Sequence, residues 1–265
     1  MPLDLPEPFE GPLPLSPLAL VACQLRYSDS KAVSGAPVAA LRQRLEAAGF
    51  PYPRVDQVQL LNLNIDVSAG TAARESAGRG WRLQSPDGRW IVTVAPDAVT
   101  LETARYGSWK GDFQSRFAAI IGSFSAVFAP RAETRLGLRY VDAISDPAVR
   151  EMREWKGLIH DSLLGPITHP LIGPGVTLLQ QQFSVALDDD IRATVRHGAY
   201  PDPSRDGGLT YLIDTDVFRE SLLPYNAANV VKATEVLHNW NLRIFQQLIT
   251  GEMLKHLHAG EAIAQ

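Results

Sequence analysis

The sequence has very little cysteine and no excess of positive charge. Cys23 is the only cysteine among the 265 residues. A single thiol excludes an intramolecular disulfide and any metal cage built from several cysteines. The formal net charge of -4 at pH 7 gives no general attraction to nucleic acid or to anionic lipid. We therefore expect neither a zinc-ribbon protein nor a general nucleic-acid binder.

The common local motifs of nucleotide and hydrolase sites are also missing. No G-x-x-x-x-G-K-[ST], G-x-G-x-x-G, G-x-S-x-G or H-E-x-x-H sequence occurs. Their absence weakens phosphate-loop, Rossmann, serine-hydrolase and zincin interpretations. It leaves open a site assembled from distant strand residues, such as Arg139 with Asp142 or Asp214, because such a site has no local spacing to detect.

The first seventeen residues contain neither a basic segment nor a long apolar run. Prolines interrupt this stretch, and proline fixes φ and removes an amide donor. The pattern matches neither a signal peptide nor a membrane span. We expect an extended, proline-rich arm over residues 1–17 that can pack against a partner. We also expect a cytoplasmic protein with no membrane association.

Hydrophobic residues make up 45% of the chain and charged residues 20%, a composition typical of a folded globular protein. Apolar periodicity and turn residues predict a first group of elements. Pro86-Asp87-Gly88 and Pro96-Asp97 are turn residues that join three of the strands into a β-meander. The predicted strands are 18–27, 55–67, 81–85, 89–95, 98–105 and 135–144, the predicted helices are 37–48 and 109–128, and 68–80 is predicted as a loop.

The second half repeats this order. We predict strands over 177–187, 191–197 and 209–218, then a long helix over 226–257. Short turns between successive strands favour antiparallel pairing, because parallel neighbours need a crossover. The predicted fold class is α+β, with two antiparallel βββα-type units packed into one globular protein and a long C-terminal helix. The predicted units cover 18–145 and 146–265 and are tightly joined.

Three stretches carry a resemblance to a known family: PLALVACQLRYS, the run from DGRWIVTVAPDAVTLETARYGSWKGDF through RLGLRYVDAI, and LIDTDVF with HNWNLRIFQQLITGEML. Together they resemble a sporadically distributed bacterial and archaeal protein family of uncharacterised function, over nearly the whole chain. The resemblance implies a fold and no catalytic residues, and Asp142 stands where its pattern favours an amide-like residue. The element order is also similar to that of SecB-like export chaperones, which is an analogy of fold only.

Two carboxylates form the sharpest enzymatic signal. Asp214 and Asp216 are two residues apart on a predicted strand, so both project from one face and can share a hard cation such as magnesium. Glu102, on the equivalent strand of the first unit, is a candidate third ligand, and Arg139 is a candidate catalytic partner. The plainer interpretation is a set of salt-bridged or solvated strand residues, which would favour a non-catalytic protein.

A second set of residues combines positive charge with indole rings. Arg79, Arg82 and Arg89 alternate with Trp81 and Trp90 around the first hairpin, and such a combination can contact phosphates and stack on bases. Ordinary sheet packing explains the same residues, since tryptophan suits strands and arginine stems cover apolar surface. With an acidic chain as a whole, we expect nucleic-acid binding to be the weaker interpretation.

The remaining candidates for metal or thiol chemistry are weak. The six histidines are scattered along the chain without a ligand spacing, and the apolar neighbours of Cys23 indicate a small buried side chain. No cofactor is indicated. The leading hypothesis is a non-catalytic accessory or protein-binding protein whose partner is another protein or a second copy. The alternatives are a metal-dependent hydrolase using the strand carboxylates and a small-ligand-binding protein.

Overall fold

The computed structural model describes residues 3–9, 11, 13–28, 33–66, 71–203 and 207–259. The fold is α+β, as predicted. The strands are β1 (Leu18–Tyr27), β2 (Arg54–Asp66), β3 (Thr71–Gln84), β4 (Trp90–Val94), β5 (Ala98–Thr103), β6 (Ala132–Ser145), β7 (Gln181–Ala186), β8 (Ile191–Pro201), β9 (Leu209–Arg219) and β10 (Leu223–Pro224). The α-helices are α1 (Gly35–Ala47), α2 (Ser115–Phe128), α3 (Asp161–Leu164), α4 (Ala227–Leu248) and α5 (Gly251–Ala259).

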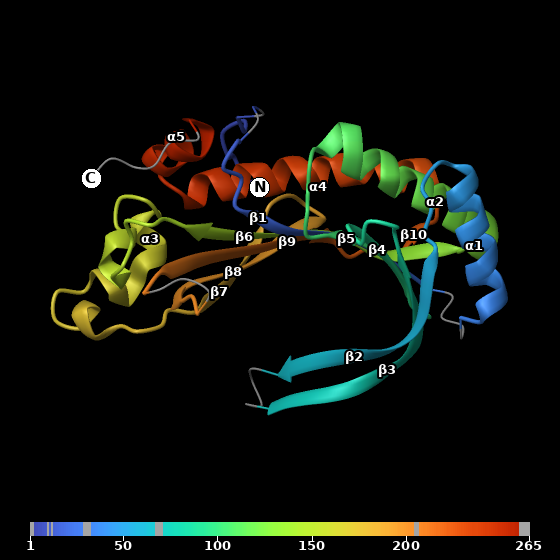
Figure 1. Cartoon of the computed structure of the whole chain (residues 1–265), viewed down its shortest axis with the longest axis horizontal. Helices are drawn as coiled ribbons and strands as arrows, with labels where there is room; N and C mark the ends of the chain where they lie inside the picture. The colour runs from blue at the N-terminus through green and yellow to red at the C-terminus, as the bar shows by residue number, and fades with distance from the viewer. Residues whose placement is uncertain are drawn as a thin grey trace. The chain divides into compact units, whose positions relative to one another are not determined.

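The strands form an antiparallel sheet in the order β2-β3-β4-β5-β1-β6-β9-β8-β7, and β10 pairs with β6 (Figure 1). Strands that follow one another in the sequence lie side by side in two runs, β2 to β5 and β7 to β9. This is the arrangement expected when short turns connect the strands. The predicted antiparallel sheet is therefore confirmed.

The chain divides into two compact units, each assembled from separate segments. Unit 1 contains Met1–Val21, Leu138–Arg219 and Glu235–Gln265, and unit 2 contains Ala22–Gly137 and Glu220–Thr234. The strands β1 and β6 and the helix α4 each contribute to both units. The predicted boundary between residues 145 and 146 rests on the repeated order of elements and not on compactness. It stays a prediction.

The core of unit 2 lies where the meander meets the helices. The burial of β4 alternates, with Trp90, Val92 and Val94 buried, because successive side chains on a strand point to opposite faces. The helix α2 buries Phe117, Ile121 and other apolar residues. A π-helical segment, η1 (Trp109–Gln114), leads into α2, and α1 packs against α2 (Figure 1).

The structure corrects one sequence prediction in this unit. Residues 71–80, predicted as loop, belong to β3, which pairs with β2 over its length. The small residues of this segment have a low intrinsic propensity for strands. Backbone pairing with the long strand β2 outweighs that low propensity. The register shifts between Leu60 and Leu61, opposite Gly78, whose φ of +95° suits glycine at an irregular strand position. Residues 67–70 lie outside the described residues.

Unit 1 contains β7, β8 and β9, covered by buried residues of α4, α5 and the short helices between β6 and β7. These short elements are η2 (Met152–Trp155), α3, η3 (Gly165–Thr168) and η4 (Gly173–Gly175). Val195, Ile213 and Leu237 belong to this core. The predicted single helix over 226–257 is wrong at one point, since it breaks between α4 and α5. Thr250 accounts for the break, because its Oγ1 donates to the Gly157 carbonyl at 2.6 Å and accepts from the Met253 N–H.

The N-terminal arm has no helix or strand before β1 in its described residues, as its prolines predict. It contacts its own unit. The amide of Gln246 on α4 both accepts from the Phe9 N–H at 2.8 Å and donates to the Phe9 carbonyl at 2.9 Å. Arg243 pairs with Glu7, and the Leu15 N–H donates to the Leu257 carbonyl. The arm is therefore part of the packing of unit 1.

Within the described residues, no helix has the length and apolar character needed to cross a membrane.

Candidate functional site

The predicted carboxylate pair lies on β9 in unit 1, and an arginine holds its first member. The Nε and Nη2 atoms of Arg139, on β6, donate to the two carboxylate oxygens of Asp214 at 2.6 Å and 2.8 Å. Arg196, on β8, lies 3.6 Å from the same carboxylate. Asp214 is buried, and guanidinium groups engage both of its oxygens. A bidentate pair of this kind is a strong and directional contact.

The strand register explains why these side chains meet. Arg196 stands opposite Asp214 in the β8–β9 ladder and opposite Gln182 in the β7–β8 ladder. Its Nε donates to the Gln182 side-chain oxygen at 3.0 Å. The hydrogen bonds that Asp214 accepts raise the pKa of Arg139, and burial opposes this shift. The row across the sheet is therefore an ion-paired network.

The other members of the predicted site are placed as follows. Asp216 lies opposite Thr194 and contributes to the raised pKa of Arg139 through its charge. Glu102 lies on β5 in unit 2, opposite Ile91. Among the described residues there is no group of three or more His, Cys, Asp or Glu side chains that can hold a metal ion. The metal-dependent interpretation stays a prediction, and Asp214 would have to release its arginines to serve it.

The residues predicted for nucleic-acid contact point in different directions. Trp90 is 2% exposed, so its ring is not open to a base. The indole N–H of Trp81 donates to the Val33 carbonyl at 2.9 Å. Arg79 and Arg82 are exposed on β3, and Arg82 projects from the strand face opposite Trp81. Trp90 is therefore buried and Trp81 half-buried, whereas Arg79 and Arg82 are exposed, and the nucleic-acid interpretation stays a prediction.

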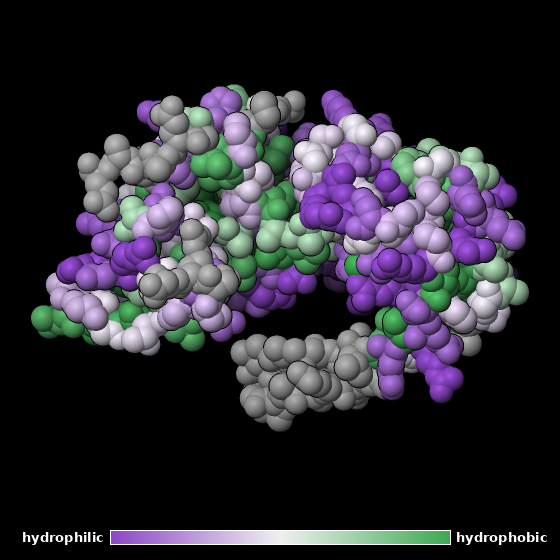
Figure 2. Space-filling view, in the orientation of Figure 1, coloured by the Kyte–Doolittle hydropathy of each residue, from purple (hydrophilic) through white to green (hydrophobic). Residues whose placement is uncertain are grey.

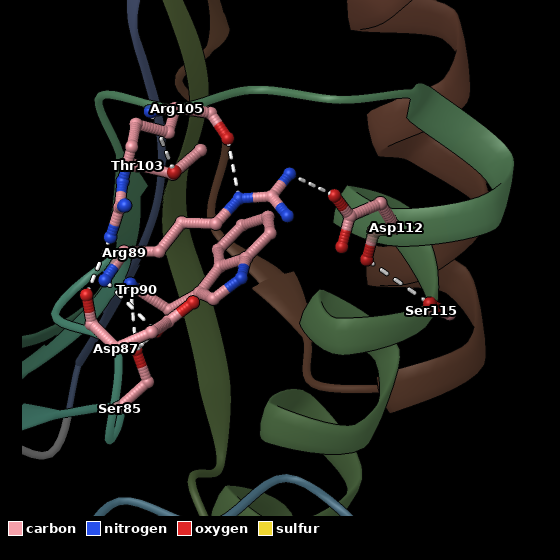
Figure 3. Close-up of polar contacts among 8 residues, drawn as sticks. All are labelled: Ser85, Asp87, Arg89, Trp90, Thr103, Arg105, Asp112 and Ser115. Atoms are coloured by element: carbon pink, nitrogen blue, oxygen red, sulfur yellow. Dashed lines mark hydrogen bonds and ion pairs between the residues drawn. The ribbon is translucent and has the colours of Figure 1, made fainter.

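Arg89 is the exception in this set, because it lies in a cluster with defined partners (Figure 3). Its Nη2 pairs with Asp112 on η1, its Nε donates to the Arg105 carbonyl, and its guanidinium lies 5.0 Å from the Trp90 ring centroid. A Cβ at Gly107 would come within 2.9 Å of both the Arg89 and Asp112 side chains. Any larger residue at that position would therefore displace the ion pair.

The predicted turn before β4 positions this cluster. The Ser85 hydroxyl donates to Asp87 Oδ1 at 2.6 Å, and the Arg89 N–H donates to the same oxygen at 3.1 Å. These two hydrogen bonds, the hydroxyl first, lower the pKa of Asp87. Gly88 has a φ of +68°, a conformation that glycine adopts without strain. Arg105 donates to the Asp87 carbonyl and closes the turn (Figure 3).

Sequence reasoning did not anticipate the burial of the Asp142 carboxyl on β6. Asp142 is 5% exposed, and burial raises its pKa to about 8. No hydrogen bond or ion pair to its side chain is found within the described residues. The carboxyl is therefore protonated at neutral pH. The sequence gives a hint, because an acid stands at a position where the resemblance noted above favours an amide-like residue.

Sequence reasoning also missed a segment of unit 1 with exposed apolar side chains, which we call the apolar loop. It is defined by Leu171, Ile172 and Leu178, which are 87%, 58% and 60% exposed. Figure 2 shows hydrophobic surface at the lower left, where Figure 1 draws the segment between α3 and β7. An ordinary soluble chain buries leucine and isoleucine in preference to other residues, so such a cluster is informative.

Hydrogen bonds hold the apolar loop in one conformation. The backbone N–H groups of Leu171 and Ile172 both donate to His169 Nδ1 at 3.2 Å. The Gly173 N–H donates to the His169 carbonyl at 2.8 Å. A pocket of about 380 Å³ lies next to the loop, and its lining includes Val176 and Arg153. His169 therefore has a structural role here.

The other histidines and the cysteine also have structural surroundings. Cys23 is completely buried on β1, as its apolar neighbours predict. His197 lies 2.9 Å from the Tyr211 hydroxyl, and His238 lies 2.7 Å from the Tyr140 hydroxyl. Burial lowers the pKa of His197. The first pair joins the neighbouring strands β8 and β9, and the second joins β6 to α4.

Comparison with known proteins gives no family. No protein-family model and no curated protein match the chain. Among solved structures, the S. pombe Pct1 RNA triphosphatase in complex with the Spt5 CTD has a TM-score of 0.12 at 10% identity, covering 94% of this chain and 88% of that one. The S. pombe Pct1 RNA triphosphatase alone has a TM-score of 0.11 at 10% identity, covering 94% and 87%. Scores this low support no conclusion about fold or function.

Proposed function

We propose that this chain is a non-catalytic protein-binding or accessory protein, and that it contacts its partner through the apolar loop. The observation that carries the proposal is the exposure of Leu171, Ile172 and Leu178 on a segment held by hydrogen bonds. Burying one such side chain is worth about 1.5–3 kcal/mol. An ordered loop that keeps three of them in water is typical of an interaction surface.

The state of the predicted carboxylate site supports the same proposal. Asp214 is paired with Arg139 and lies near Arg196, and a salt-bridged set was the arrangement expected of an accessory protein. The partner is another protein or a second copy of the chain. The division into two repeated βββα units, the cytoplasmic location and the small-ligand alternative stay predictions.

A substitution on the loop tests the proposal directly. Leu171→Asp with Ile172→Asp places two charges on the contact surface and leaves the core untouched. We expect this double variant to lose binding by about tenfold or more, since each lost apolar contact is worth about 1 kcal/mol or more. Cross-linking with mass spectrometry in the native host would identify the partner, and light scattering would measure self-association.

Leu222→Asp is the matched control, because Leu222 is also exposed but lies in unit 2, next to β10. It should leave binding unchanged. The proposal fails if the double variant retains all interactions of the native chain. It also fails if the native chain remains a monomer and no partner cross-links to the loop.

A further inference from the structure

Arg116, on α2 in unit 2, lies between aromatic rings. Its guanidinium carbon is 4.5 Å from the Phe50 ring centroid and 4.6 Å from the Trp90 ring centroid. The Tyr52 ring is farther away, at 6.0 Å. Stacking on aromatic faces favours a guanidinium over an ammonium. The rings fix the plane of the guanidinium, but its N–H groups need hydrogen-bond acceptors from other groups.

Arg116 has few hydrogen-bond acceptors for its donors. A guanidinium carries five N–H donors. Nη1 lies 3.5 Å from the Tyr52 hydroxyl, which is the limit of a hydrogen bond. Nε is buried without an acceptor. Within the described residues no carboxylate pairs with Arg116, although Arg89 and Arg139 each have an aspartate partner.

Tyr52 adds a second donor at the same place. Its side chain is buried, and burial is the main cause of its raised pKa, which contact with Arg116 partly offsets. The phenol therefore keeps its proton at neutral pH. Its oxygen faces Arg116, and no acceptor for its O–H is found within the described residues. Two neighbouring donors thus lack an acceptor.

The charged groups near Arg116 are engaged with partners other than Arg116. Arg89 is paired with Asp112, and Arg105 donates to a backbone carbonyl of the turn. The charge of Asp87 reaches Tyr52 and is the smallest of the contributions to its raised pKa. Within the described residues, the close partners of the Arg116 guanidinium are aromatic rings and the Tyr52 hydroxyl, and a charge that is partly removed from water is stabilised by a counter-charge or a hydrogen-bonding partner.

We infer that Arg116 and Tyr52 form a binding site for an oxyanion, the carboxylate or phosphate group of a small molecule. Such a group accepts two hydrogen bonds from the guanidinium fork and has lone pairs left for the phenol O–H. It supplies a counter-charge that none of the described carboxylates provides at this position. The π-helical segment η1, which directly precedes α2, fits this assignment, because π-helical turns are frequent at functional sites.

Titration of the full chain with simple oxyanions tests the inference. The probes are sodium phosphate and sodium citrate, each balanced with sodium chloride to constant ionic strength. Binding is measured by calorimetry and by tryptophan fluorescence, since Trp90 packs against Arg116. We expect saturable binding of at least one probe. Preference for phosphate or for citrate distinguishes a phosphorylated ligand from a carboxylic acid.

Three variants separate a binding role from a structural one. Arg116→Lys keeps the charge but loses the fork, and we expect affinity to fall about tenfold. Tyr52→Phe keeps the ring and should weaken binding about threefold to tenfold through the loss of one hydrogen bond. Arg82→Met removes an exposed arginine of the same unit and should leave affinity unchanged.

Thermal unfolding of each variant verifies that it is folded before binding is measured. The inference is overturned if the native chain binds neither probe, or if Arg116→Lys and Tyr52→Phe bind as tightly as the native chain. It is also overturned if Arg82→Met weakens binding as much as Arg116→Lys, because the effect would then be one of overall charge.

Discussion

The two units hold their partly buried arginines in different ways. In unit 1, Arg139 forms a bidentate pair with Asp214, and Arg196 lies on the same carboxylate. In unit 2, Arg116 lies between two aromatic rings and has no carboxylate partner within the described residues. In the first arrangement, both oxygens of the carboxylate accept hydrogen bonds from the guanidinium. In the second, aromatic rings stabilise the cation, and we propose that its remaining hydrogen-bond donors bind a ligand.

Carboxyl groups show the same contrast within unit 1. Asp214 is buried with counter-charges, whereas Asp142 is buried with none among the residues that the structure describes. A buried carboxyl without a partner becomes neutral, because desolvation disfavours its charged form. Burial alone therefore does not decide the charge of a side chain in this protein; the partners that reach it do.

Removing the Trp90 ring, which contacts both Arg89 and Arg116, should have the largest effect on stability. Trp90→Ala deletes a fully buried indole that packs against Arg89, Arg116 and Phe113. We expect it to lower the free energy of unfolding by about 3–5 kcal/mol. Trp90→Phe keeps an aromatic face and should cost less. Urea unfolding followed by circular dichroism measures both, and a cost below about 1 kcal/mol for Trp90→Ala would show that the rings do not support this cluster.

Replacing the neutral carboxyl of unit 1 should have a pH-dependent effect. The pKa of Asp142 rises from 3.8 to about 8 on folding, so the folded state keeps a proton that the unfolded state releases above pH 4. Stability is therefore lost as pH rises from about 4 to 8. Asp142→Asn removes this loss and should stabilise the protein at pH 7 by about 1–4 kcal/mol, the upper figure corresponding to the roughly three pH units between the unfolded-state pKa and pH 7.

The measurement is urea unfolding of both proteins at pH 4.5 and pH 8. The difference between them should be small at the lower pH and large at the higher. Asp188→Asn, at an exposed turn position, is the control and should change neither value. Parallel pH profiles for the native chain and Asp142→Asn would mean that Asp142 is ionised in the folded protein.

Breaking the ion-paired network of unit 1 should have the smallest effect of the three. Asp214→Asn keeps the shape of the side chain but removes the charge that faces Arg139 and Arg196. A buried pair broken on one side costs about 3–5 kcal/mol, but both arginines are almost half exposed and solvent screens them. We therefore expect about 1–3 kcal/mol, measured by urea unfolding.

A double-mutant cycle with Arg139→Met isolates the pair itself, and a coupling energy near zero would remove the contrast between the two units. Asp216→Asn serves as the control, since Asp216 is less buried than Asp214, and should cost less than about 1 kcal/mol.

Much of the fold was predictable because its signals are local. The strand over 18–27 and the meander from Trp81 to Thr103 follow from runs of apolar residues between turn residues. The residues 71–80 were missed because their place in a sheet depends on pairing with β2, and Ala, Gly and Ser carry no strand signal of their own. The break before α5 depends on Thr250 and the Gly157 carbonyl, 93 residues apart.

The candidate sites were less predictable than the fold. The spacing of Asp214 and Asp216 correctly places both on one strand, but it does not reveal the arginine 75 residues away that engages Asp214. Trp81 and Trp90 alternate with arginines in the sequence, but this pattern does not reveal that Trp90 is buried while Arg79 and Arg82 are exposed. Phe50, Trp90 and Arg116 have no common motif, so nothing in the sequence connects them.

The sequence by itself determined the α+β class, the antiparallel connections, the extended arm and the buried state of Cys23, because each depends on neighbouring residues and on apolar periodicity. Only the tertiary structure decided which charges are neutralised. It brought Asp214 to Arg139, buried Asp142 with no partner in the described part of the chain and placed Arg116 between two rings. The physical reason is that charge and hydrogen bonding depend on distances between residues far apart in the chain, and local patterns do not contain those distances.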